Sequence, residues 1–351
     1  MTYPTKKLGE ISRIFSGSSA PQDEKCFKNG KYPFVRVFDL STPRSGTELV
    51  ETRDYVNELA IMELNLVEAQ KGAIVFPKSG ASILNNNRAM LGANAYVVSH
   101  LSAIEVNEDL AMKNWVYYFL SKFDMGKLVS DPGYPSLNIS AIKKIKIPLP
   151  PLEIQKQIVE RLDKIVEARK LNDGLIQKTD ELFQSLLHKE LNPAGTAAAK
   201  AMAGKKKWKE DKFIVGYTDN EEKVYKMDSP VIIFGDHTRI FKYADFNFAI
   251  GADGTQIIIP NPKKFIPKFF YFSMLNLKIN NLGYSRHFKL LKTKKLVIPP
   301  LQTQKQIVAK LSAVQDYKKQ LLGQKSKLKE LFDSALAKSM SNNNILINLR
   351  M

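Results

Sequence analysis

The sequence of 351 residues is poor in the residues that form disulfides and metal sites. Its single cysteine, Cys26, excludes an internal disulfide and leaves a zinc cluster of the usual thiolate kind without ligands. We expect Cys26 to be a small, semi-buried side chain. The four histidines do not have the spacing of metal ligands; they are His100, His188, His237 and His287. The sequence therefore predicts no metal site.

Long apolar runs are missing as well. No segment approaches the roughly 18 consecutive apolar residues that mark a membrane-spanning helix. The N-terminal stretch MTYPTKKLGEISRIF has no apolar core of the length found in signal peptides. We therefore expect the protein to work in the cytoplasm, without contact with a membrane.

The motifs of DNA-acting enzymes are also absent. The Ala-rich stretch AGTAAAKAMAGKKK lacks the first spaced glycine of a phosphate-binding loop. No Gly-rich turn between a strand and a helix suits a dinucleotide or a methyl donor. The Asn-Pro pairs at Asn192 and Asn261 lack the following proline and aromatic residue that adenine methyltransferases use to hold a flipped base. The sequence therefore favours a binding protein over an enzyme, with no cofactor in this chain.

Negative charge is scarce in one region. The chain contains 53 Lys and Arg against 35 Asp and Glu, which gives a formal net charge of +18. No Asp or Glu occurs from Gly254 to Gln315. The basic residues of this tract are Lys263, Lys264, Lys268, Lys278, Arg286, Lys289, Lys292, Lys294, Lys295, Lys305 and Lys310. An unspecialised surface normally mixes both signs, so this acid-free tract favours a polyanionic partner such as nucleic acid.

One segment of the sequence occurs twice. PPLEIQKQIVERL at 150–162 returns as PPLQTQKQIVAKL at 299–311, with nine of thirteen positions identical and an offset of 149 residues. ELFQSLLHK at 181–189 returns at the same offset as ELFDSALAK at 330–338. The period is too long for a solenoid repeat. We therefore expect two copies of a globular module, each followed by one long helix.

The repeated segments predict two long helices. Each begins at a Pro-Pro pair, which presets the backbone of a helix start. Apolar residues then follow in steps of three and four; they are Ile158, Leu162, Ile165, Ile176, Phe183 and Leu186 in the first copy, and Ile307, Leu311, Val314, Leu321, Leu328, Phe332 and Ala335 in the second. A helix of about 38 residues, with a rise of about 1.5 Å per residue, is roughly 55 to 60 Å long. Pairing of the two helices as a coiled coil explains the stripes better than packing of each helix on its own small module.

The globular modules have the short, punctuated runs of a mixed α+β fold. Strands are expected at YPFVRVFDL, GAIVFP and NAYVVSHLSAIEV in the first module, and at SPVIIFGDHTRIF, FNFAIGAD and TQIIIP in the second. NWVYYFLSKF at 114–123 predicts a helix capped by Asn114, and KKFIPKFFYFSMLNLKI predicts a second helix. Both modules close with Tyr and Ser, then basic residues, then a short strand that runs into Pro-Pro.

These patterns predict the following order along the chain. The first module is 1–146, the first long helix region 147–193, the linker 194–207, the second module 208–297, the second long helix region 298–341, and the tail 342–351. The second module is the shorter, because it lacks an opening like LGEISRIFSGSSAP. Either it is naturally short or it has lost an N-terminal portion.

Taken together, these segments resemble the specificity subunit of a type I restriction-modification system, over nearly the whole chain. IPLPPLEIQKQIV and VIPPLQTQKQIV carry the resemblance most specifically. GDHTRIFKYADFNFAIGADGT, GYSRHFKLLK, LGEISRIFSGSSAP and YPFVRVFDL are similar to segments of its target recognition domains.

The resemblance implies a non-catalytic subunit that binds double-stranded DNA. Each target recognition domain would read one half of a split sequence, and the two helices would pack antiparallel as a spacer. The same helices would dock two methyltransferase subunits, to which S-adenosylmethionine would belong. A separate restriction subunit, driven by ATP with Mg, would join to cleave DNA. The implied docking residues on the repeated helices are Gln155, Ile158, Leu162, Gln304, Ile307 and Leu311.

Candidate DNA contacts lie in two polar regions. In the loop PKSGASILNNNR they are Lys78, Ser79, Gly80, Ser82, Asn86 and Arg88. The cations suit phosphates, the serines are small hydrogen-bonding groups beside a permissive glycine, and asparagine suits adenine edges. In the second module they are Asp236, His237, Arg239, Tyr284, Arg286, His287 and Lys289. An ordinary polar surface loop is the alternative for the first region, and phosphate anchoring is the alternative to base reading for each arginine.

Two other functions remain open on the sequence alone. A coiled-coil scaffold that binds only proteins explains the helices but not the acid-free tract. A DNA-binding subunit whose partner carries methylation and cleavage in one fused chain fits the sequence equally well.

Overall fold

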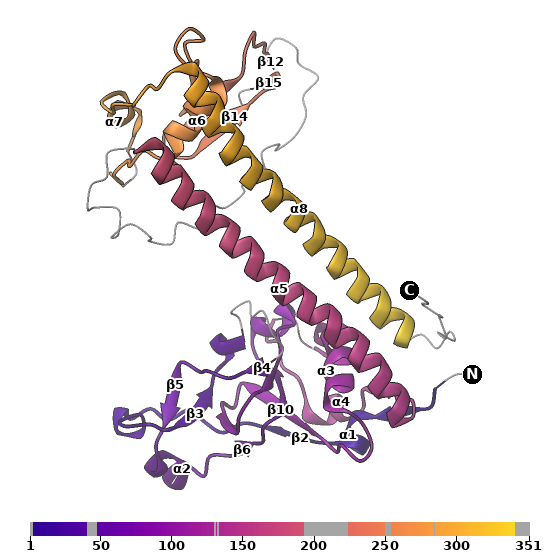
Figure 1. Ribbon diagram of the computed structural model, residues 1–351. Coiled ribbons are helices and arrows are strands. Elements are labelled where there is room, and N and C mark those ends of the chain that lie inside the picture. Colours follow the sequence, from indigo (N-terminus) through magenta and orange to yellow (C-terminus); the bar gives the residue numbers. More distant parts are fainter. Residues whose placement is uncertain are drawn as a thin grey trace. The chain divides into compact units, whose positions relative to one another are not determined.

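The computed structural model describes residues 3–40, 48–129, 131, 133–192, 224–249, 254–283 and 285–340. The chain divides into two compact units. The first unit is Met1–Asp173 together with Gln324–Met351, and the second is Gly174–Gly323. Each unit therefore contains one globular module and parts of both long helices (Figure 1). The predicted linker 194–207 and tail 342–351 lie outside the described residues.

The two predicted long helices are confirmed. Helix α5 spans Leu152–Leu191 and helix α8 spans Leu301–Met340, each of 40 residues. Both start directly after the Pro-Pro pair, and the carbonyl of Pro151 accepts the first hydrogen bonds of α5, from Ile154 N at 2.9 Å and Gln155 N at 3.0 Å. A proline at this point loses no hydrogen bond, because the first amides of a helix have no partner within it.

The helices pair antiparallel within each unit. In the second unit Asp180 pairs with Lys318 at 3.0 Å, and Glu190, later on α5, pairs with Lys310, earlier on α8, at 2.9 Å. In the first unit Lys325 pairs with Asp173 at 2.8 Å. Lys318 and Lys325 interrupt the apolar stripe of α8, and the structure shows why, because both cations reach a carboxylate on α5. Such partly exposed pairs stabilise by at most about 1 kcal/mol each, so the apolar seam dominates.

The core of each unit takes side chains from both helices. In the first unit Val159 and Leu162 of α5 lie with Phe332 and Leu336 of α8 in one cluster with the globular module. In the second unit, the corresponding cluster contains Phe183, Leu187 and Leu191 of α5 and Ile307 and Leu311 of α8. The repeated ELF segments therefore each pack against the module that belongs to the other sequence repeat.

The first module contains two main sheets and a two-stranded ribbon. The five-stranded sheet has the order β2-β10-β7-β8-β4, the four-stranded sheet β5-β3-β9-β6, and the ribbon β1-β11. Its strands are β1 (Thr5–Lys7), β2 (Ser12–Ser16), β3 (Tyr32–Val35), β4 (Glu48–Leu49), β5 (Asp54–Val56), β6 (Glu68–Ala69), β7 (Ile74–Pro77), β8 (Ala89–Leu91), β9 (Ala95–Val97), β10 (Leu101–Val106) and β11 (Lys146–Pro148). Its helices are α1 (Leu8–Ile11), α2 (Glu58–Leu64), α3 (Lys113–Lys122) and α4 (Ile139–Lys143), with 3-10 turns η1 (Glu24–Cys26), η2 (Val37–Leu40), η3 (Ala81–Asn85) and η4 (Met125–Leu128).

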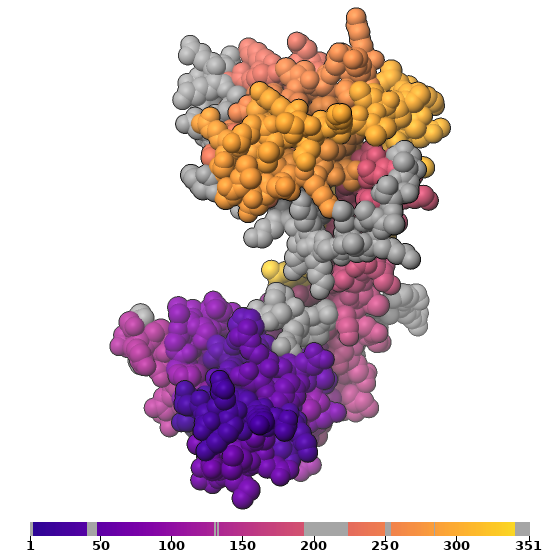
Figure 2. Space-filling model, turned by 90° about the vertical axis from the view of Figure 1, so that its left-hand side faces the viewer, coloured from indigo at the N-terminus to yellow at the C-terminus, as the bar shows by residue number. Residues whose placement is uncertain are grey.

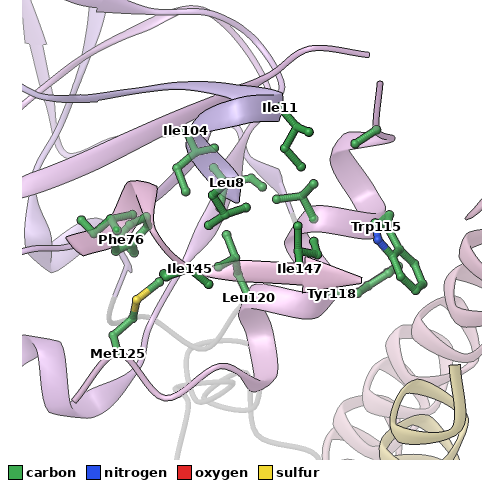
Figure 3. Packing of buried hydrophobic residues seen from close by; sticks show 14 of the residues in the cluster. Leu8, Ile11, Phe76, Ile104, Trp115, Tyr118, Leu120, Met125, Ile145 and Ile147 are labelled. Atoms are coloured by element: carbon green, nitrogen blue, oxygen red, sulfur yellow. The ribbon is translucent and has the colours of Figure 1, made fainter. Parts of the chain in front are cut away.

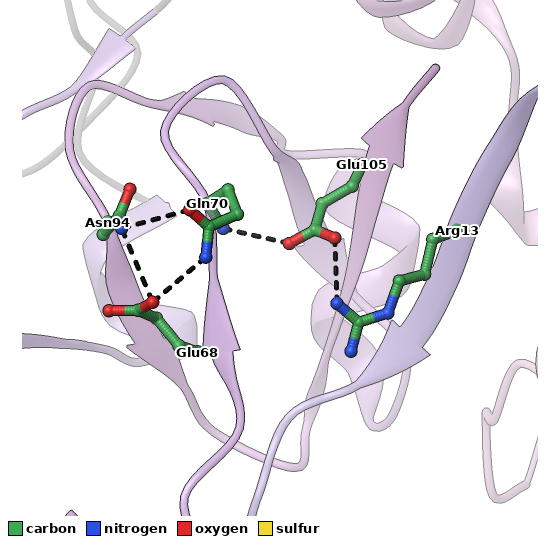
Figure 4. Close-up of polar contacts among 5 residues, drawn as sticks. All are labelled: Arg13, Glu68, Gln70, Asn94 and Glu105. Carbon is green, nitrogen blue, oxygen red and sulfur yellow. Dashed lines mark hydrogen bonds and ion pairs between the residues drawn. The ribbon is translucent and has the colours of Figure 1, made fainter.

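A polar network ties the two main sheets of the first module together (Figure 4). Glu105 on β10 accepts from Arg13 of β2 at 3.1 Å and from the backbone N of Gln70 at 3.0 Å. The side-chain amide of Gln70 donates to Glu68 on β6 at 3.0 Å, and its Oε1 accepts from the side-chain amide of Asn94 at 3.2 Å. The network fixes the turn after β6 against the edge of the larger sheet.

Helix α3 packs between the larger sheet and the long helices (Figure 3). Trp115 is fully buried and its indole N–H donates to the carbonyl of Pro148 at 2.9 Å. The prediction that Asn114 caps this helix was wrong, because the helix begins at Lys113 with Met112 as its cap residue. Asn114 lies inside the helix, and its amide reaches Asp163 of α5 at 3.4 Å.

The second module is built around one small antiparallel sheet. Its order is β14-β13-β16, and a separate ribbon pairs β12 with β15. The elements are β12 (Val224–Tyr225), β13 (Val231–Gly235), β14 (Phe241–Ala244), β15 (Phe248–Ala249), β16 (Thr255–Ile258), α6 (Pro267–Leu275) and α7 (Phe288–Lys292). This sheet matches β8-β7-β10 of the first module in connection and direction. The described residues of the second module contain no counterpart of the four-stranded sheet.

The strand predicted before each Pro-Pro pair forms only once. In the first module it is β11, which is antiparallel to β1 with Lys6 opposite Ile147. In the second module, residues 293–300 belong to no helix or strand, so the prediction was wrong there. The reason is physical: a strand needs a hydrogen-bonding partner, and no described residue of the second module stands where β1 stands in the first.

Candidate nucleic-acid interface

The two predicted DNA-contact regions occupy the same place in the two modules. In each case the loop follows the central strand of the three-stranded arrangement, β7 or β13. Lys78 N donates to the carbonyl of His100 at 2.9 Å, and Lys78 O accepts from Leu137 N at 2.8 Å. Asp236 repeats both bonds, with Gly254 O at 2.8 Å and His287 N at 3.3 Å. Lys78 and Asp236 are therefore structural equivalents, although no sequence match relates them.

The loop of the first module is joined to the segment before α4. Gly80 N donates to Pro135 O at 2.8 Å, and Ser79 forms a bridge with Ser136. Gly80 has φ of 80°, a conformation that favours glycine, and it is exposed. Ser82 is half-buried, and its hydroxyl donates to the Ser79 carbonyl at 3.3 Å. Lys78 and Ser79 are half-buried at the start of the loop.

Three neighbours of this loop were missed by sequence reasoning. The Ser79 hydroxyl lies 2.7 Å from Nδ1 of the exposed His100. Tyr134 is 80% exposed and Ser136 is exposed on the joined segment. The repeated ending, Tyr and Ser ahead of basic residues, was the available signal for Tyr134 and Ser136. No sequence pattern indicated His100.

Arg88 supports the loop from inside. Its guanidinium donates to the Asn86 side chain and to the carbonyl of Phe123 at 3.2 Å. The same Asn86 oxygen accepts from Met125 N at 3.3 Å, so the pair joins η3 to η4. Burial lowers the pKa of Arg88 to about 10, and among the described residues its Nε and Nη1 have no partner. In this structure Arg88 supports the loop, and the phosphate contact predicted for it stays a prediction.

Asp236 and His287 form a buried link in the second module. They are 2% and 0% exposed. Nε2 of His287 accepts from Leu282 N at 3.0 Å, so Nδ1 carries the proton that is donated to Asp236 O at 2.8 Å. The Asp236 carboxylate accepts from Phe288 N at 2.7 Å. Both residues were predicted to read DNA, but in this structure they hold the loop after β13 against the start of α7.

The remaining predicted residues of the second module differ in exposure. Arg286 and Lys289 are exposed on either side of His287, and His237 is exposed on the loop after β13. Arg239 is half-buried, has φ of 59°, and donates to Ile279 O at 3.4 Å. Tyr284 lies outside the described residues. Arg286 and Lys289 are thus the predicted cations that the fold presents at the surface here.

The acid-free tract, which lies in the orange part of the second unit in Figure 2, contributes many exposed cations to the surface. Lys268 is half-buried; the exposed members are Lys263, Lys264, Lys278, Arg286, Lys289, Lys292, Lys294, Lys295, Lys305 and Lys310. Lys310 is paired with Glu190, and Lys292 lies over the Phe288 ring at 4.9 Å. A surface of this kind attracts a polyanion over distances up to the Debye length, about 8 Å at physiological salt.

Five of the six residues predicted to dock a partner are buried inside this chain. Leu162, Ile307 and Leu311 belong to the unit cores, and Ile158 is half-buried. The remaining two, Gln155 and Gln304, have internal roles of their own.

Gln155 and Gln304 join each long helix to the helix of its own module. Gln155 accepts from Met112 N at 2.8 Å and donates to Pro150 O at 2.8 Å. Gln304 accepts from Ile266 N at 2.8 Å and donates to Lys264 O at 2.8 Å and Pro299 O at 2.9 Å. Met112 and Ile266 are the cap residues of α3 and α6. The repeated glutamine therefore serves the same purpose twice.

Other residues of the repeated segment are exposed. Leu152 and Leu301 are 41% and 44% exposed. Lys156, Gln157, Lys305 and Gln306 are also exposed, and their side chains make no hydrogen bond or ion pair with the described residues. We call Leu152, Lys156 and Gln157, with Leu301, Lys305 and Gln306, the outward triads. The internal packing of the chain does not explain why these residues are the same in both copies.

None of the helices in the described ranges combines the length and the apolar character of a membrane span.

These two modules with two long helices correspond to a known class of protein. The model of the type I restriction modification DNA specificity domain matches residues 2–180 and 188–334. The matches cover most of the chain, so the protein belongs to this family.

Curated relatives agree with this membership. The specificity subunit of the type I restriction enzyme MjaIX of Methanocaldococcus jannaschii is 30% identical over 190 residues, which are 50% of this chain and 43% of the relative. The specificity subunit of EcoR124I/EcoR124II of Escherichia coli is 27% identical over 199 residues, 52% of this chain and 47% of the relative. The matched regions thus span less than half the length of these relatives.

Solved structures share the fold. The crystal structure of a type I restriction-modification S subunit from M. genitalium has a TM-score of 0.57 at 14% identity, covering 98% of this chain and 97% of that chain. A second structure, described as the basis of complex assembly and conformational transition of a type I system, has a TM-score of 0.56 at 15% identity, covering 98% of each chain. The predicted combination of mixed modules and long helices is confirmed at the level of the fold.

Proposed function

We propose that this chain is the non-catalytic subunit that gives a type I restriction-modification complex its DNA specificity. Each module reads one part of a two-part double-stranded site. The observation that carries the proposal is the equivalence of the two loops after β7 and β13, because two modules of one plan present the same loop to two stretches of DNA. Methyltransferase subunits supply S-adenosylmethionine, restriction subunits supply ATP with Mg, and the complex works in the cytoplasm.

In each module, some residues contact DNA and others hold those residues in position. In the first module the loop from Lys78 to Ser82 and the joined Tyr134 and Ser136 face DNA, with Asn86 and Arg88 behind them. In the second, Arg286 and Lys289 face DNA, with Asp236 and His287 behind them. Arginine suits guanine edges, whereas the lysines of the acid-free tract suit phosphates.

The outward triads support docking of methyltransferase subunits on the long helices. One triad lies in each unit, and the two have the same three residue types at the same spacing. Equal surfaces bind equal partners, so two copies of one subunit are the expected complement. Each triad offers an apolar side chain, a cation and an amide, which suits an interface that is partly apolar and partly polar. A scaffold that binds only proteins would leave the basic tract without a purpose.

DNA binding by this chain is expected to weaken steeply with salt. Contact of the exposed lysines with about six phosphates predicts a slope of log affinity against log salt of about −5 or steeper. Fluorescence anisotropy with a labelled duplex between low and physiological salt measures this slope. Lys263→Ala together with Lys264→Ala should reduce the steepness by up to about two if both lysines meet phosphates. A flat response to salt would favour the scaffold function.

A further inference from the structure

The two modules differ at one edge, just before the Pro-Pro pair. In the first module β1 and α1 cover this edge. Leu149 N donates to Pro4 O at 2.8 Å, and Leu8 N donates to Ile145 O at 2.9 Å. The strand β1 thus adds along β11, and α1 follows it directly.

Helix α1 places two aliphatic side chains in the core of the first module. Leu8 and Ile11 are 0% and 2% exposed, and Ile142, Ile145 and Ile147 are buried in the same cluster (Figure 3). Gly9 allows the close approach, since a Cβ at this position would lie 3.0 Å from Cβ of Lys143 on α4. The segment from Pro4 to Ile11 is therefore an extended strand followed by one helical turn with an aliphatic residue at each end.

The same edge recurs in the second module, where the described residues include no counterpart of β1 and α1 to cover it. Residues 291–301 match 142–152 at the repeat offset of 149 residues, and α7 matches α4 residue for residue. Ile298 is the counterpart of Leu149 and Val297 that of Pro148. They are 49% and 62% exposed, and the backbone of 295–298 forms no hydrogen bond with another described residue. We call 295–298 the open edge.

A cavity lies beside the open edge. Its volume is about 250 Å³, and its apolar lining includes Ile258, Phe270, Met274, Leu277, Phe288 and Leu291. Leu296 of the open edge and Lys292 and Lys294 complete it. In the first module the counterparts of Leu291 and Leu296 are Ile142 and Ile147, which pack in the same cluster as Leu8 and Ile11. The volume exceeds the ~150 Å³ of an engineered apolar cavity that accepts benzene.

We propose that the open edge and its cavity are a docking site for a segment of a partner protein. The segment adds to residues 295–298 as an antiparallel strand and then places two aliphatic side chains, three residues apart, in the cavity. Main-chain hydrogen bonds provide affinity and the cavity provides selectivity, as in other cases of strand addition. Lys292, Lys294 and Lys295 are exposed around the site, so the segment is acidic beside its aliphatic residues. DNA has no aliphatic group of this kind to offer.

The first module supplies a probe for this site. A labelled peptide with the sequence YPTEELGEISRI copies residues 3–14 with Lys6→Glu and Lys7→Glu. Titrated into the full chain, it is expected to bind at one site per chain, because the first module is already covered by its own segment. The same peptide with Leu8→Asp and Ile11→Asp should not saturate the chain. The unaltered peptide with both lysines should bind several-fold more weakly.

Two proline variants of the chain make the test specific to strand addition. Ile298→Pro removes the N–H that corresponds to the donor of Leu149, and should weaken peptide binding by about tenfold. Val297→Pro is the matched control, because the first module carries Pro148 at that position within a paired strand. Both side chains are largely exposed, so the unfolding curves of the two variants should equal that of the parent chain.

The binding experiments distinguish a segment of a partner protein from a second copy of this chain. Saturable binding that Ile298→Pro weakens and Val297→Pro preserves supports the proposal. Absence of saturable binding, or equal weakening by both prolines, overturns it. Reversible self-association of the chain that Ile298→Pro abolishes would assign the site to a second copy and would also overturn it. None of these outcomes depends on DNA binding, so the proposed function stands or falls separately.

Discussion

Replacing Phe332 with alanine is expected to destabilise the packing of α3 by about 3 to 5 kcal/mol, although Phe332 belongs to the other sequence repeat. Its ring is 6% exposed and meets the ring of Tyr118 on α3 edge-on, with centroids 5.5 Å apart. The equivalent change in the second unit is Phe183→Ala, since Phe183 meets Phe272 of α6 at 5.9 Å. The effect of each substitution should therefore appear in the module of the opposite repeat.

Amide hydrogen exchange measures the effects on α3 and on α6 separately. Phe332→Ala should speed exchange of the α3 amides, and Phe183→Ala should speed exchange of the α6 amides. The matched controls are the neighbouring substitutions Leu331→Ala and Leu182→Ala, at residues that are 52% and 50% exposed. They should change the free energy of opening of the α3 and α6 amides by no more than about 0.5 kcal/mol. If Phe332→Ala loosened α6 and left α3 unchanged, the crossed packing of the repeats would be contradicted.

Replacing Gln155 or Gln304 with leucine is expected to cost about 2 to 4 kcal/mol of stability. Each change leaves a cap N–H and at least one carbonyl buried without a partner, and the leucine cannot replace either bond. Gln157→Leu and Gln306→Leu are matched controls two residues further along each helix, on its exposed side, and should stay within about 0.5 kcal/mol. Urea unfolding, followed by far-UV circular dichroism, measures the difference. Equal effects at 155 and 157 would show that the hydrogen bonds to the caps contribute little.

The architecture could be predicted because its signals are local and repeated. A Pro-Pro pair marks where each long helix starts, and apolar residues in steps of three and four mark the buried side of it. The same stripe does not say which segment covers it, because any apolar surface of suitable shape satisfies the pattern. The packing of each ELF segment on the module of the other repeat was therefore not predictable. In the four-stranded sheet, β3 and β9 lie within predicted strands, whereas β5 and β6 were not predicted, since two or three residues give little alternation.

Polar residues were the hardest part of the site to place. Gln155 and Asp236 look like surface groups in a sequence, yet each satisfies backbone groups that the fold buries. Burying a polar side chain is favourable when it completes hydrogen bonds that would otherwise be lost. Composition alone cannot distinguish this use from contact with a ligand. The position of the two loops was predicted correctly, because glycine, asparagine and serine mark turns after apolar strands.

We propose above all that this chain decides which DNA sequence its complex methylates. The direct test is a map of methylated bases in cells that produce the chain with its methyltransferase subunits, compared with the same cells carrying Arg286→Ala. Arg286 is exposed and forms no hydrogen bond, ion pair or ring contact with the described residues, so the variant should fold normally. We expect the parent chain to give one two-part sequence, and Arg286→Ala to relax the bases of one part while the other part is unchanged. Methylation of the same sites with and without the chain would contradict the claim.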